Sequence, residues 1–331
     1  MGGVTAFPWE GKAAMRKFVA PAMVGIGAFL LIAGILALVW APGAVKKTPL
    51  DVNTVTLLSG EAQKFDPELG KMAASRPIYA QSITRVDSAA STDDTAVWAQ
   101  WSCVAFGAGG ECMDRNDPNV VLVPDDQLVG APTGTVFGSD RVTAEGVKVE
   151  DLPKGARADE ASTTVGLVNK FPFDSQKKDY TYWDGTIGEG VPAKFDRTEK
   201  VKGHEAYVYT VEVTKKTIEI AENTMGTYSD LKEIYVDPAT GSILNQTEQQ
   251  QRWLEDGTQA LDLSIGFTDQ QVASNVEDAK SNGRSLTLIT TVVPLVGLIG
   301  GALLVVGGLL LARVRGGSRK SEGAERPLVS A

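Results

Sequence analysis

Side chains that could support catalysis or bind a metal are few in this sequence. It contains one histidine, His204, and two cysteines among 331 residues. A closed zinc site usually needs four Cys or His ligands, and no G-x-S-x-G motif offers His204 a serine nucleophile. Walker A, H-E-x-x-H and C-x-x-C motifs are absent as well. We interpret His204 as a structural residue at the start of a strand, and we predict no catalytic residue, no metal and no cofactor.

Carboxylates are abundant, but their spacing gives little support to acid–base chemistry. Asp93-Asp94 and Asp125-Asp126 are adjacent pairs, and neighbours on a strand point to opposite faces. The segment 114–119, DRNDPN, could offer oxygen ligands to calcium, yet it lacks the spacing of an EF-hand loop. We interpret it as a solvated turn, with a calcium site as the alternative.

The two cysteines, Cys103 and Cys112, are separated by VAFGAGGE, whose three glycines allow the chain to turn back. A disulfide is expected if this segment lies in an oxidising compartment. Two free thiols are the first alternative, and a zinc pair is less favoured because the histidine is distant.

The segment 171–183 is rich in aromatic residues and contains two lysines. Apolar walls with a few polar groups are typical of ligand pockets. Two interpretations therefore stay open, which are core packing beside a basic turn and the rim of a groove for a lipid or glycan. The candidate groove residues are Phe171, Phe173, Tyr180, Tyr182 and Trp183.

Two uncharged runs, 18–45 and 285–312, dominate the ends of the chain. Each has 28 residues without Asp, Glu, Lys, Arg or His. A helix of this length is about 42 Å long, enough to cross a bilayer with its headgroup zones. We predict transmembrane helices at 18–42 and 285–312. The first run exceeds the roughly 7–15 apolar residues of a signal peptide, so we expect an uncleaved anchor.

Charge predicts the orientation of these helices. The segment 43–284 has 24 basic and 38 acidic residues, a net charge of −14. Basic residues flank the helices at the ends of the chain, which the positive-inside rule places in the cytoplasm: Lys12, Arg16, Lys17, Arg313, Arg315, Arg319, Lys320 and Arg326. We expect a multi-pass plasma-membrane protein with cytoplasmic tails at 1–17 and 313–331. The acidic extracytoplasmic segment disfavours nucleic-acid binding.

The segment 43–284 has the alternating pattern of β-strands. We predict one β-rich (α+β) domain, with two lobes meeting near 140–165 as the alternative. Asp237–Gly241 predicts a hairpin loop, and Asp184-Gly185 another turn. The predicted strands are 55–58, 96–104, 120–123, 205–213, 217–220, 233–236, 243–250 and 260–267.

One further helix is expected from Asp269 to Lys280, with Thr268 as its cap. Asn282-Gly283 should end it before the second span, and Pro294 should kink that span. Within the span, Gly297 and Gly301 form a small-xxx-small pattern that allows close helix packing. The partner could be the first span or another membrane protein. Neither span contains an ionisable residue, which disfavours a proton or ion pathway through them.

Several segments resemble the actinobacterial DUF3068 family, also labelled the porin PorA family. They are GIGAFL at 25–30, KTPL at 47–50, FPFD at 171–174, KKDYTYWD at 177–184 and GHEAYVY at 203–209. The resemblance extends over nearly the whole chain and implies no catalytic residue. The layout of helix, β-rich domain and helix is also similar to that of CD36-type lipid receptors, in arrangement only.

We therefore expect a non-enzymatic cell-envelope protein. Its extracytoplasmic domain would bind a membrane lipid, a lipoglycan or an envelope partner. An accessory or scaffold subunit of a membrane complex is the alternative. A carboxylate-dependent hydrolase and a pore-forming protein are less favoured, because a porin barrel alternates apolar and polar residues along membrane-spanning strands.

Overall fold

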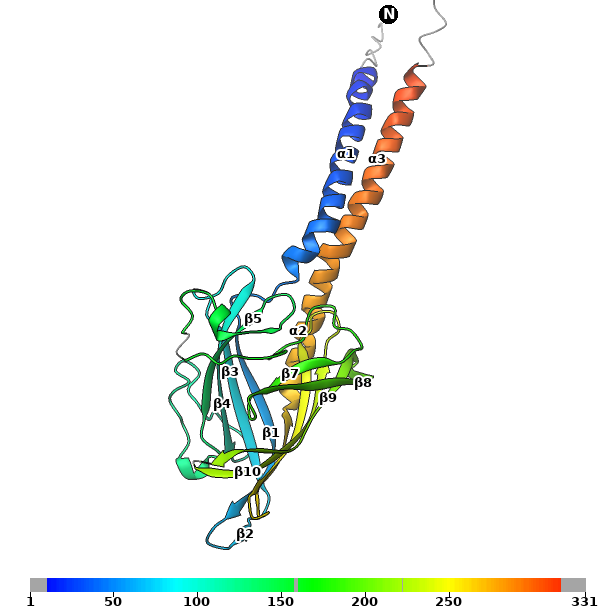
Figure 1. Ribbon diagram of the computed structural model, residues 1–331. Helices are drawn as coiled ribbons and strands as arrows, with labels where there is room; N and C mark the ends of the chain where they lie inside the picture. Colours follow the sequence, from blue (N-terminus) through cyan, green and yellow to red (C-terminus); the bar gives the residue numbers. More distant parts are fainter. Residues whose placement is uncertain (1–10, 158–159, 222, 317–331) are drawn as a thin grey trace, which may run out of the picture. The chain divides into compact units, whose positions relative to one another are not determined.

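The computed structural model describes residues 11–157, 160–221 and 223–316. The chain forms two compact units, Met1–Val45 with Arg284–Ala331 and Lys46–Gly283, and each is described by itself (Figure 1). The helices are α1 (Gly11–Val45), α2 (Asp269–Thr287) and α3 (Val293–Gly316), with a π-helical turn at Leu288–Val292 and 3-10 turns at Asp125–Gln127 and Val149–Asp151. The strands are β1 (Asn53–Asp66), β2 (Lys71–Met72), β3 (Arg76–Val86), β4 (Thr95–Phe106), β5 (Thr133–Asp140), β6 (Gly146–Val147), β7 (Tyr180–Asp184), β8 (Glu189–Val201), β9 (His204–Ala221), β10 (Thr224–Val236), β11 (Ile243–Leu254) and β12 (Gln259–Phe267).

Helices α1 and α3 pack directly against each other through small residues. A Cβ added to Gly301 would lie 2.7 Å from the carbonyl oxygen of Gly27, and one added to Gly297 would lie 3.3 Å from that of Leu30. A Cβ added to Gly300 would meet nothing within 4 Å. The glycines at 297 and 301 therefore let the two backbones approach closely, and the predicted packing residues lie at an intrachain contact.

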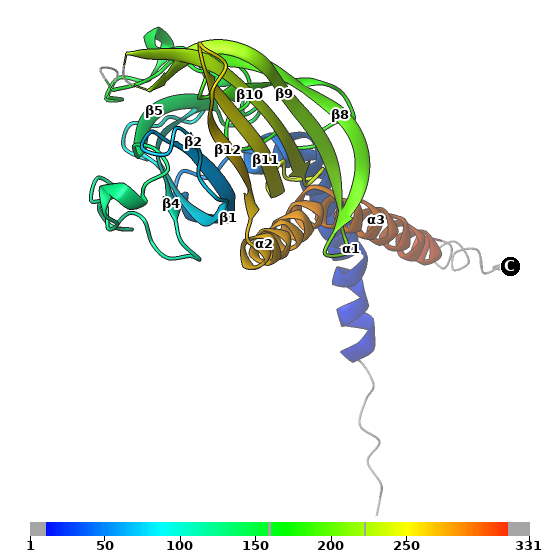
Figure 2. The same cartoon turned by 90° about the horizontal axis from the view of Figure 1, so that it is seen from below.

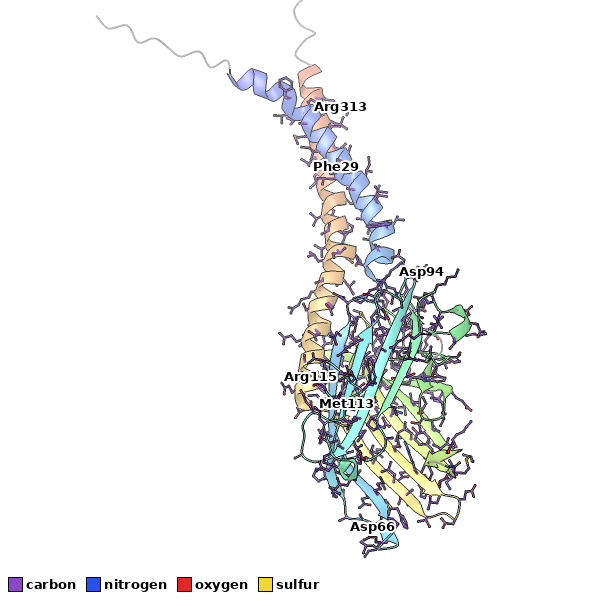
Figure 3. All side chains as sticks on the ribbon, turned by 90° about the vertical axis from the view of Figure 1, so that its left-hand side faces the viewer. Phe29, Asp66, Asp94, Met113, Arg115 and Arg313 are labelled. Atoms are coloured by element: carbon purple, nitrogen blue, oxygen red, sulfur yellow. A yellow bond between two sulfur atoms is a disulfide. The ribbon has the colours of Figure 1, made fainter. Side chains whose placement is uncertain are left out.

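The outer surface of this helix pair is apolar. Phe29 on α1 is 68% exposed (Figure 3), and Leu303 on α3 is 69% exposed. By length and composition, the helical stretches Phe18–Val45 and Asp269–Arg313 could each cross a membrane. Exposed apolar side chains of this kind are unusual on a helix that faces water.

The helix that follows the sheet is longer than predicted. Thr268 Oγ1 accepts a hydrogen bond from the amide of Gln271 at 3.1 Å, which confirms the cap. The predicted end at Asn282-Gly283 is wrong, because α2 continues to Thr287 and leads through the π-helical turn into α3. A helical glycine costs only about 1 kcal/mol, which the following apolar run offsets. The π-helical turn lies just before Pro294, where a backbone donor is missing.

The Lys46–Gly283 unit is built on one antiparallel sheet that curves into a half-barrel (Figure 2). Its described strands follow the order β6-β5-β4-β3-β1-β12-β11-β10-β9-β8-β7, and β2 pairs with β1. The central pair joins the two ends of this unit, since Leu58 of β1 faces Phe267 of β12. The strands that flank the stretch 140–165 belong to the same sheet, and Lys46–Gly283 forms one compact unit, so the two-lobe alternative is wrong.

The two faces of the sheet are covered differently. Helix α2 packs its Val272, Val276 and Ala279 against one face, which we call the outer face, beside Val208 and Leu244. The opposite, inner face carries two large apolar clusters and a smaller one around Trp98 and Phe137. One large cluster centres on Ile78, Leu263 and Ile265, and the other on Phe171, Tyr209 and Ile234.

Most predicted strands are present, with differences at the bulges and prolines. The runs at 205–213 and 217–220 form one strand, β9, whose pairing with β10 shifts between Tyr228 and Asp230. The strand predicted at 120–123 is wrong, because only a single bridge joins Val121 to Met113. Pro118 and Pro124 flank this run and cannot donate to a ladder. The predicted hairpin loop is confirmed, with Gly241 at φ +73° between β10 and β11.

A short segment around Leu167 joins the two edges of the sheet. Leu167 forms bridges both to Glu145, beside β6, and to Tyr182 of β7. Its amide donates to the carbonyl of Thr181 at 2.8 Å, and its carbonyl accepts from the amide of Trp183 at 2.9 Å. We call this contact the seam, and it satisfies backbone groups that an open edge would leave unpaired.

Glycine is required at the seam. Gly166 has φ +90°, and a Cβ there would lie 2.5 Å from the carbonyl oxygen of Thr181. A Cβ added to Gly190 would likewise lie 2.8 Å from the carbonyl oxygen of Val165. A side chain at either position would push the segment away from β7 or β8.

Replacing Gly166 by Ala is expected to lower the free energy of unfolding by about 2–4 kcal/mol, because overpacking adds to backbone strain. Gly155→Ala is the matched control, since Gly155 has φ +107° with nothing within 4 Å of an added Cβ. It should cost only the strain, about 1–2 kcal/mol. Chemical denaturation followed by tryptophan fluorescence measures both values. Equal losses in the two variants would show that the seam contact contributes little.

Candidate functional site

The inner face of the sheet holds a buried group of charged side chains between its two large apolar clusters. Lys232 lies at its centre, with its Nζ 3.3 Å from Asp184 Oδ2, 2.5 Å from Asp230 Oδ2 and 3.7 Å from Glu248 Oε1. The side chains of Asp184 and Asp230 are 1% and 0% exposed. We call these residues the inner ionic cluster.

Neighbouring polar groups extend this cluster. The hydroxyl of Tyr228 donates to Asp184 Oδ2 at 3.2 Å. Gln250 donates to Glu248 at 3.1 Å and accepts from Arg252 at 3.0 Å. Three carboxylates thus face two cations, so the cluster lacks one positive charge when all its groups are ionised.

Asp230 is the carboxylate of the cluster most able to bind a proton, which would balance the charge. Its Oδ1 is buried and has no hydrogen-bond partner among the described residues. Burial raises the pKa of Asp230 to about 7, although Lys232 acts in the opposite direction. Burial also lowers the pKa of Lys232, but Glu248, Asp230 and Asp184 together raise it well above its ordinary value. The lysine therefore stays charged while Asp230 titrates near neutrality.

The raised pKa of Asp230 makes stability depend on pH. The folded state holds the proton up to about pH 7, whereas an unfolded Asp loses it near pH 4. The free energy of unfolding should therefore fall as the pH rises from about 4 to about 7. Asp230→Asn should remove most of that fall, because an amide does not ionise.

Urea titrations at pH 4.5, 6 and 7.5 measure this effect. Asp256→Asn is the control, since Asp256 lies in an exposed turn and hydrogen bonds from Thr258 lower its pKa. This control should keep the wild-type fall between pH 4.5 and 7.5. A pH profile unchanged by Asp230→Asn would show that another group causes it.

The aromatic residues predicted to border a groove mainly pack together. Phe171 is fully buried, and its ring centroid lies 4.6 Å from Tyr209, 5.5 Å from Tyr180 and 6.1 Å from Tyr182. Phe171 therefore belongs to the inner core, as the core-packing interpretation of this segment predicted, and the groove-rim interpretation is wrong for this residue. The physical reason is that β7 and β9 enclose its segment.

The other four candidates for the groove rim are partly exposed, and their contacts differ. Tyr180 and Tyr182 belong to the packed rings, and burial raises the pKa of Tyr182 to about 12. Phe173 lies against the ammonium of Lys170, 3.7 Å from the ring centroid to Nζ. Trp183 joins the seam through its backbone amide.

The outer face carries a polar hollow that the sequence did not reveal. It has a volume of about 410 Å³ and extends over β9, β10, β11 and β12. Strand alternation brings its side chains to one surface. They supply hydroxyl, amide and carboxylate groups, chiefly from Ser229, Gln249, Gln251, Asp262 and Ser264. Gln251 donates to Asp262 at 3.3 Å, so the hollow already has an ordered polar floor.

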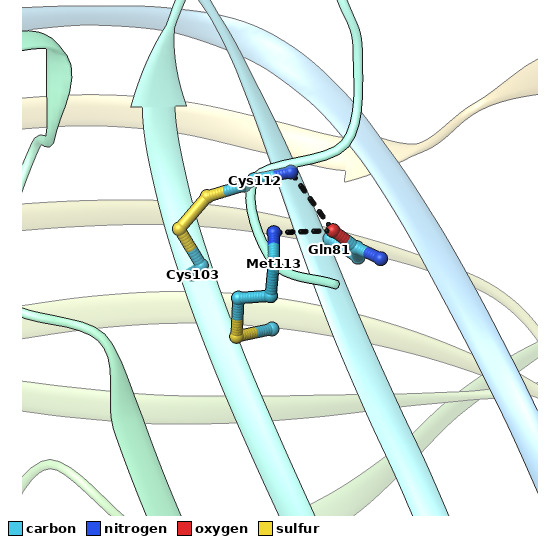
Figure 4. Close-up of a disulfide and its surroundings, with 4 residues drawn as sticks. All are labelled: Gln81, Cys103, Cys112 and Met113. Atoms are coloured by element: carbon cyan, nitrogen blue, oxygen red, sulfur yellow. Dashed lines mark hydrogen bonds between the residues drawn. A yellow bond between two sulfur atoms is a disulfide. The ribbon is translucent and has the colours of Figure 1, made fainter. Parts of the chain in front are cut away.

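The disulfide between Cys103 and Cys112 is confirmed, and it links β4 to the loop that follows this strand (Figure 4). Both residues are buried. Gln81 of β3 fixes the loop by accepting from the amides of Cys112 at 2.9 Å and Met113 at 3.0 Å. Burial makes this bond a structural link, out of contact with thiols in solution.

The remaining sequence candidates have structural partners. His204 Nε2 lies 2.7 Å from Asp237 Oδ1, and Thr240 holds the other oxygen of that carboxylate. Asp114 accepts from the amides of Asn116 and Asp117, which lower its pKa. Within the described ranges, no group of three or more His, Cys, Asp or Glu side chains could hold a metal ion.

A comparison with protein families shows to which family this chain belongs. The family model described as Porin PorA matches residues 19–310. The chain belongs to the porin PorA family. The match includes both apolar helices and the whole sheet, as the resemblance of the sequence implied.

Other comparisons add little to the family assignment. No curated protein matches the chain. Among solved structures, Aeromonas veronii immune modulator A is similar at 9% identity, over 68% of this chain and 99% of that chain, with a TM-score of 0.13. A similarity this low supports no conclusion about this porin PorA family member.

Proposed function

We propose that this protein is a non-enzymatic component of a cell envelope, anchored in the plasma membrane by α1 and by the helical stretch that includes α3. The β-rich unit then lies on the extracytoplasmic side and binds an envelope ligand. The main support is the pair of 28-residue uncharged runs, whose helices pack together and expose apolar side chains elsewhere.

The charge distribution and the disulfide support this orientation. The acidic segment 43–284 and the basic ends follow the positive-inside pattern. A disulfide is stable outside the cytoplasm. Both termini are then cytoplasmic.

Cysteine labelling in intact cells tests this topology. We expect a membrane-impermeant maleimide to label Asp256→Cys, in an exposed turn of the β-rich unit, without permeabilisation. Arg313→Cys, near the end of α3, should react only after permeabilisation. The native cysteines give little background because they are buried in a disulfide. The reverse pattern would contradict the orientation.

The polar hollow on the outer face favours a hydrophilic ligand, such as the glycan of a lipoglycan. Paired amide, hydroxyl and carboxylate groups match the donors and acceptors of sugar hydroxyls. The inner face, in contrast, is filled by buried side chains such as Tyr209 and Ile78. An acyl chain would have to displace that packing.

Loss of the hollow's polar floor should weaken ligand binding. The double variant Gln251→Ala/Asp262→Ala removes both partners of one hydrogen bond. Gln259, which also donates to Asp262 at 3.2 Å, is partly exposed and can bond to water instead. We expect at least about tenfold less co-purified ligand, corresponding to about 1.4 kcal/mol. Gln127→Ala is the control, because Gln127 is exposed and distant in the sequence from the residues that line the hollow. Native mass spectrometry of the full chain in mild detergent gives the readout, and equal adducts in both variants would contradict this site.

The family description raises a pore as a second function. A transmembrane barrel needs an apolar band on its outer surface, whereas the outer face here carries Gln249, Gln251, Asp262 and Ser264. This strand pattern argues against a pore through the sheet. Conductance of the purified chain in planar bilayers would support a pore, which the helices of several copies of the chain would have to form.

Two other functions have weaker support. A carboxylate-dependent hydrolase would need accessible carboxyl groups, and the inner carboxylates are instead held by Lys232. A scaffold role would use the exposed helix surfaces. Gentle extraction and pull-down would detect a stable partner and favour the scaffold role.

A further inference from the structure

We propose that Lys170, together with Thr48 and Asn169, binds an oxyanion of the phosphate type, either free or as the phosphate of a lipid headgroup. Only the lipid source rests on the proposed membrane function. The oxyanion site itself follows from the β-rich unit alone.

Lys170 is a cation without an acidic partner. Its Nζ lies 3.4 Å from Thr48 Oγ1 and 3.7 Å from the centroid of Phe173. Among the described residues, no carboxylate lies within 4 Å of it. The nearby lysines differ, because Lys46 pairs with Asp174 and Lys47 lies 3.5 Å from Asp94. Lys64 and Lys71 also lack a carboxylate of a described residue within 4 Å, but they are exposed to water, whereas Lys170 is half-buried.

Partial burial makes this isolation costly. Loss of water around the ammonium lowers the pKa of Lys170 to about 8, and no carboxylate opposes that effect. A cation removed from water is stable when an anion and hydrogen bonds replace the solvent. The aromatic face of Phe173 supplies part of that compensation, and a bound oxyanion would supply the rest.

Asn169 provides a second unsatisfied donor beside this lysine in the chain. Its Nδ2 is buried and has no hydrogen-bond partner among the described residues. Buried amide donors are seldom left unpaired. Asn169 also has φ +62°, and the amide of Lys170 donates to the carbonyl of Val168 at 2.7 Å. This tight turn places the two donors on adjacent residues of one short segment.

Thr48 completes the set of donors and is itself held in place. Its amide donates to the carbonyl of Arg141 at 2.7 Å, and its carbonyl accepts from Arg141 Nε at 2.8 Å. While Thr48 Oγ1 accepts from Lys170, its hydroxyl hydrogen remains able to donate. An ammonium, an amide and a hydroxyl together suit a phosphate, which accepts several hydrogen bonds at once.

The position of Thr48 in the chain suggests the lipid source. It follows Val45, the last residue of α1, by three residues. If α1 crosses a membrane, phosphate-bearing headgroups are the anions most concentrated beside this segment. The segments 47–50 and 171–174, which carry the family resemblance, both border the site.

Competitive acylation of the lysines in the wild-type full chain tests the proposal. Isotopically labelled acetic anhydride and mass spectrometry at pH 8 compare Lys170 with Lys64, which donates to the carbonyl of Val129 at 3.1 Å. One arm adds inorganic phosphate to protein in phospholipid-free maltoside detergent, at constant ionic strength. The other uses nanodiscs of phosphatidylglycerol without phosphate buffer. We expect either source to slow acylation of Lys170 at least about fivefold relative to Lys64.

Variants test whether the amine is the binding group. Phosphate should raise the Tm of the wild type and of Lys64→Met, by preferential binding to the folded state. Lys170→Met should lose this rise, and Lys170→Arg should keep part of it because it retains the charge.

Each result has a defined meaning. Protection in both arms supports an oxyanion site that accepts a headgroup, and protection by phosphate alone overturns the lipid source. Equal protection of Lys64 and Lys170, or protection in neither arm, overturns the site. The detergent arm does not depend on topology, so failure of the membrane orientation would leave it interpretable.

Discussion

The structure depends on how the two edges of a wide antiparallel sheet find backbone partners. Unpaired edges bind other strands and promote aggregation. Here one segment around Leu167 pairs with Glu145 on one side and Tyr182 on the other, so a half-barrel is tied at a single line of contact. The contact is possible because Gly166 and Gly190 leave no side chain between the backbones. Closure in turn encloses Phe171 and places it against Tyr209, where one inner core forms.

The enclosed face is chemically mixed, which sets this sheet apart from an ordinary hydrophobic sandwich. Two apolar clusters flank a layer in which Lys232 holds Asp184 and Asp230. Breaking such a buried pair on one side leaves an uncompensated charge and is strongly destabilising. A shift in the register of β10 would separate Lys232 from Glu248 of β11 and would carry this cost. The outer face is divided in a different way, among α2, the disulfide-linked loop that follows β4, and an open polar surface on β9 to β12.

The sequence predicted the local features well and the long-range ones poorly. The uncharged runs predicted the apolar helices, alternation predicted the two parts of β9, and turn residues predicted the hairpin at 237–241, because each of these features depends on neighbouring residues. The inner ionic cluster could not be found, since Asp184, Lys232 and Glu248 are distant in the chain and look like surface residues singly. The same holds for Lys170 and Thr48. Strand alternation in 243–254, which puts Gln249 and Gln251 on one face, was the one available signal for the polar hollow. Both interpretations of Phe171, core and groove rim, stayed open because composition does not distinguish a groove from a core.

The central pairing of β1 with β12 has a consequence for biosynthesis. Leu58 faces Phe267, and every other strand is inserted between them in the chain. A ribosome must therefore complete almost the whole domain before the middle of the sheet can form. Until then β1 can pair only with the two-residue β2 at its end and with β3, and the edge that will meet β12 stays open to other chains. Slow, long-range pairing of this kind exposes nascent chains to aggregation, so a chaperone or rapid delivery to the membrane would have its greatest effect during this interval.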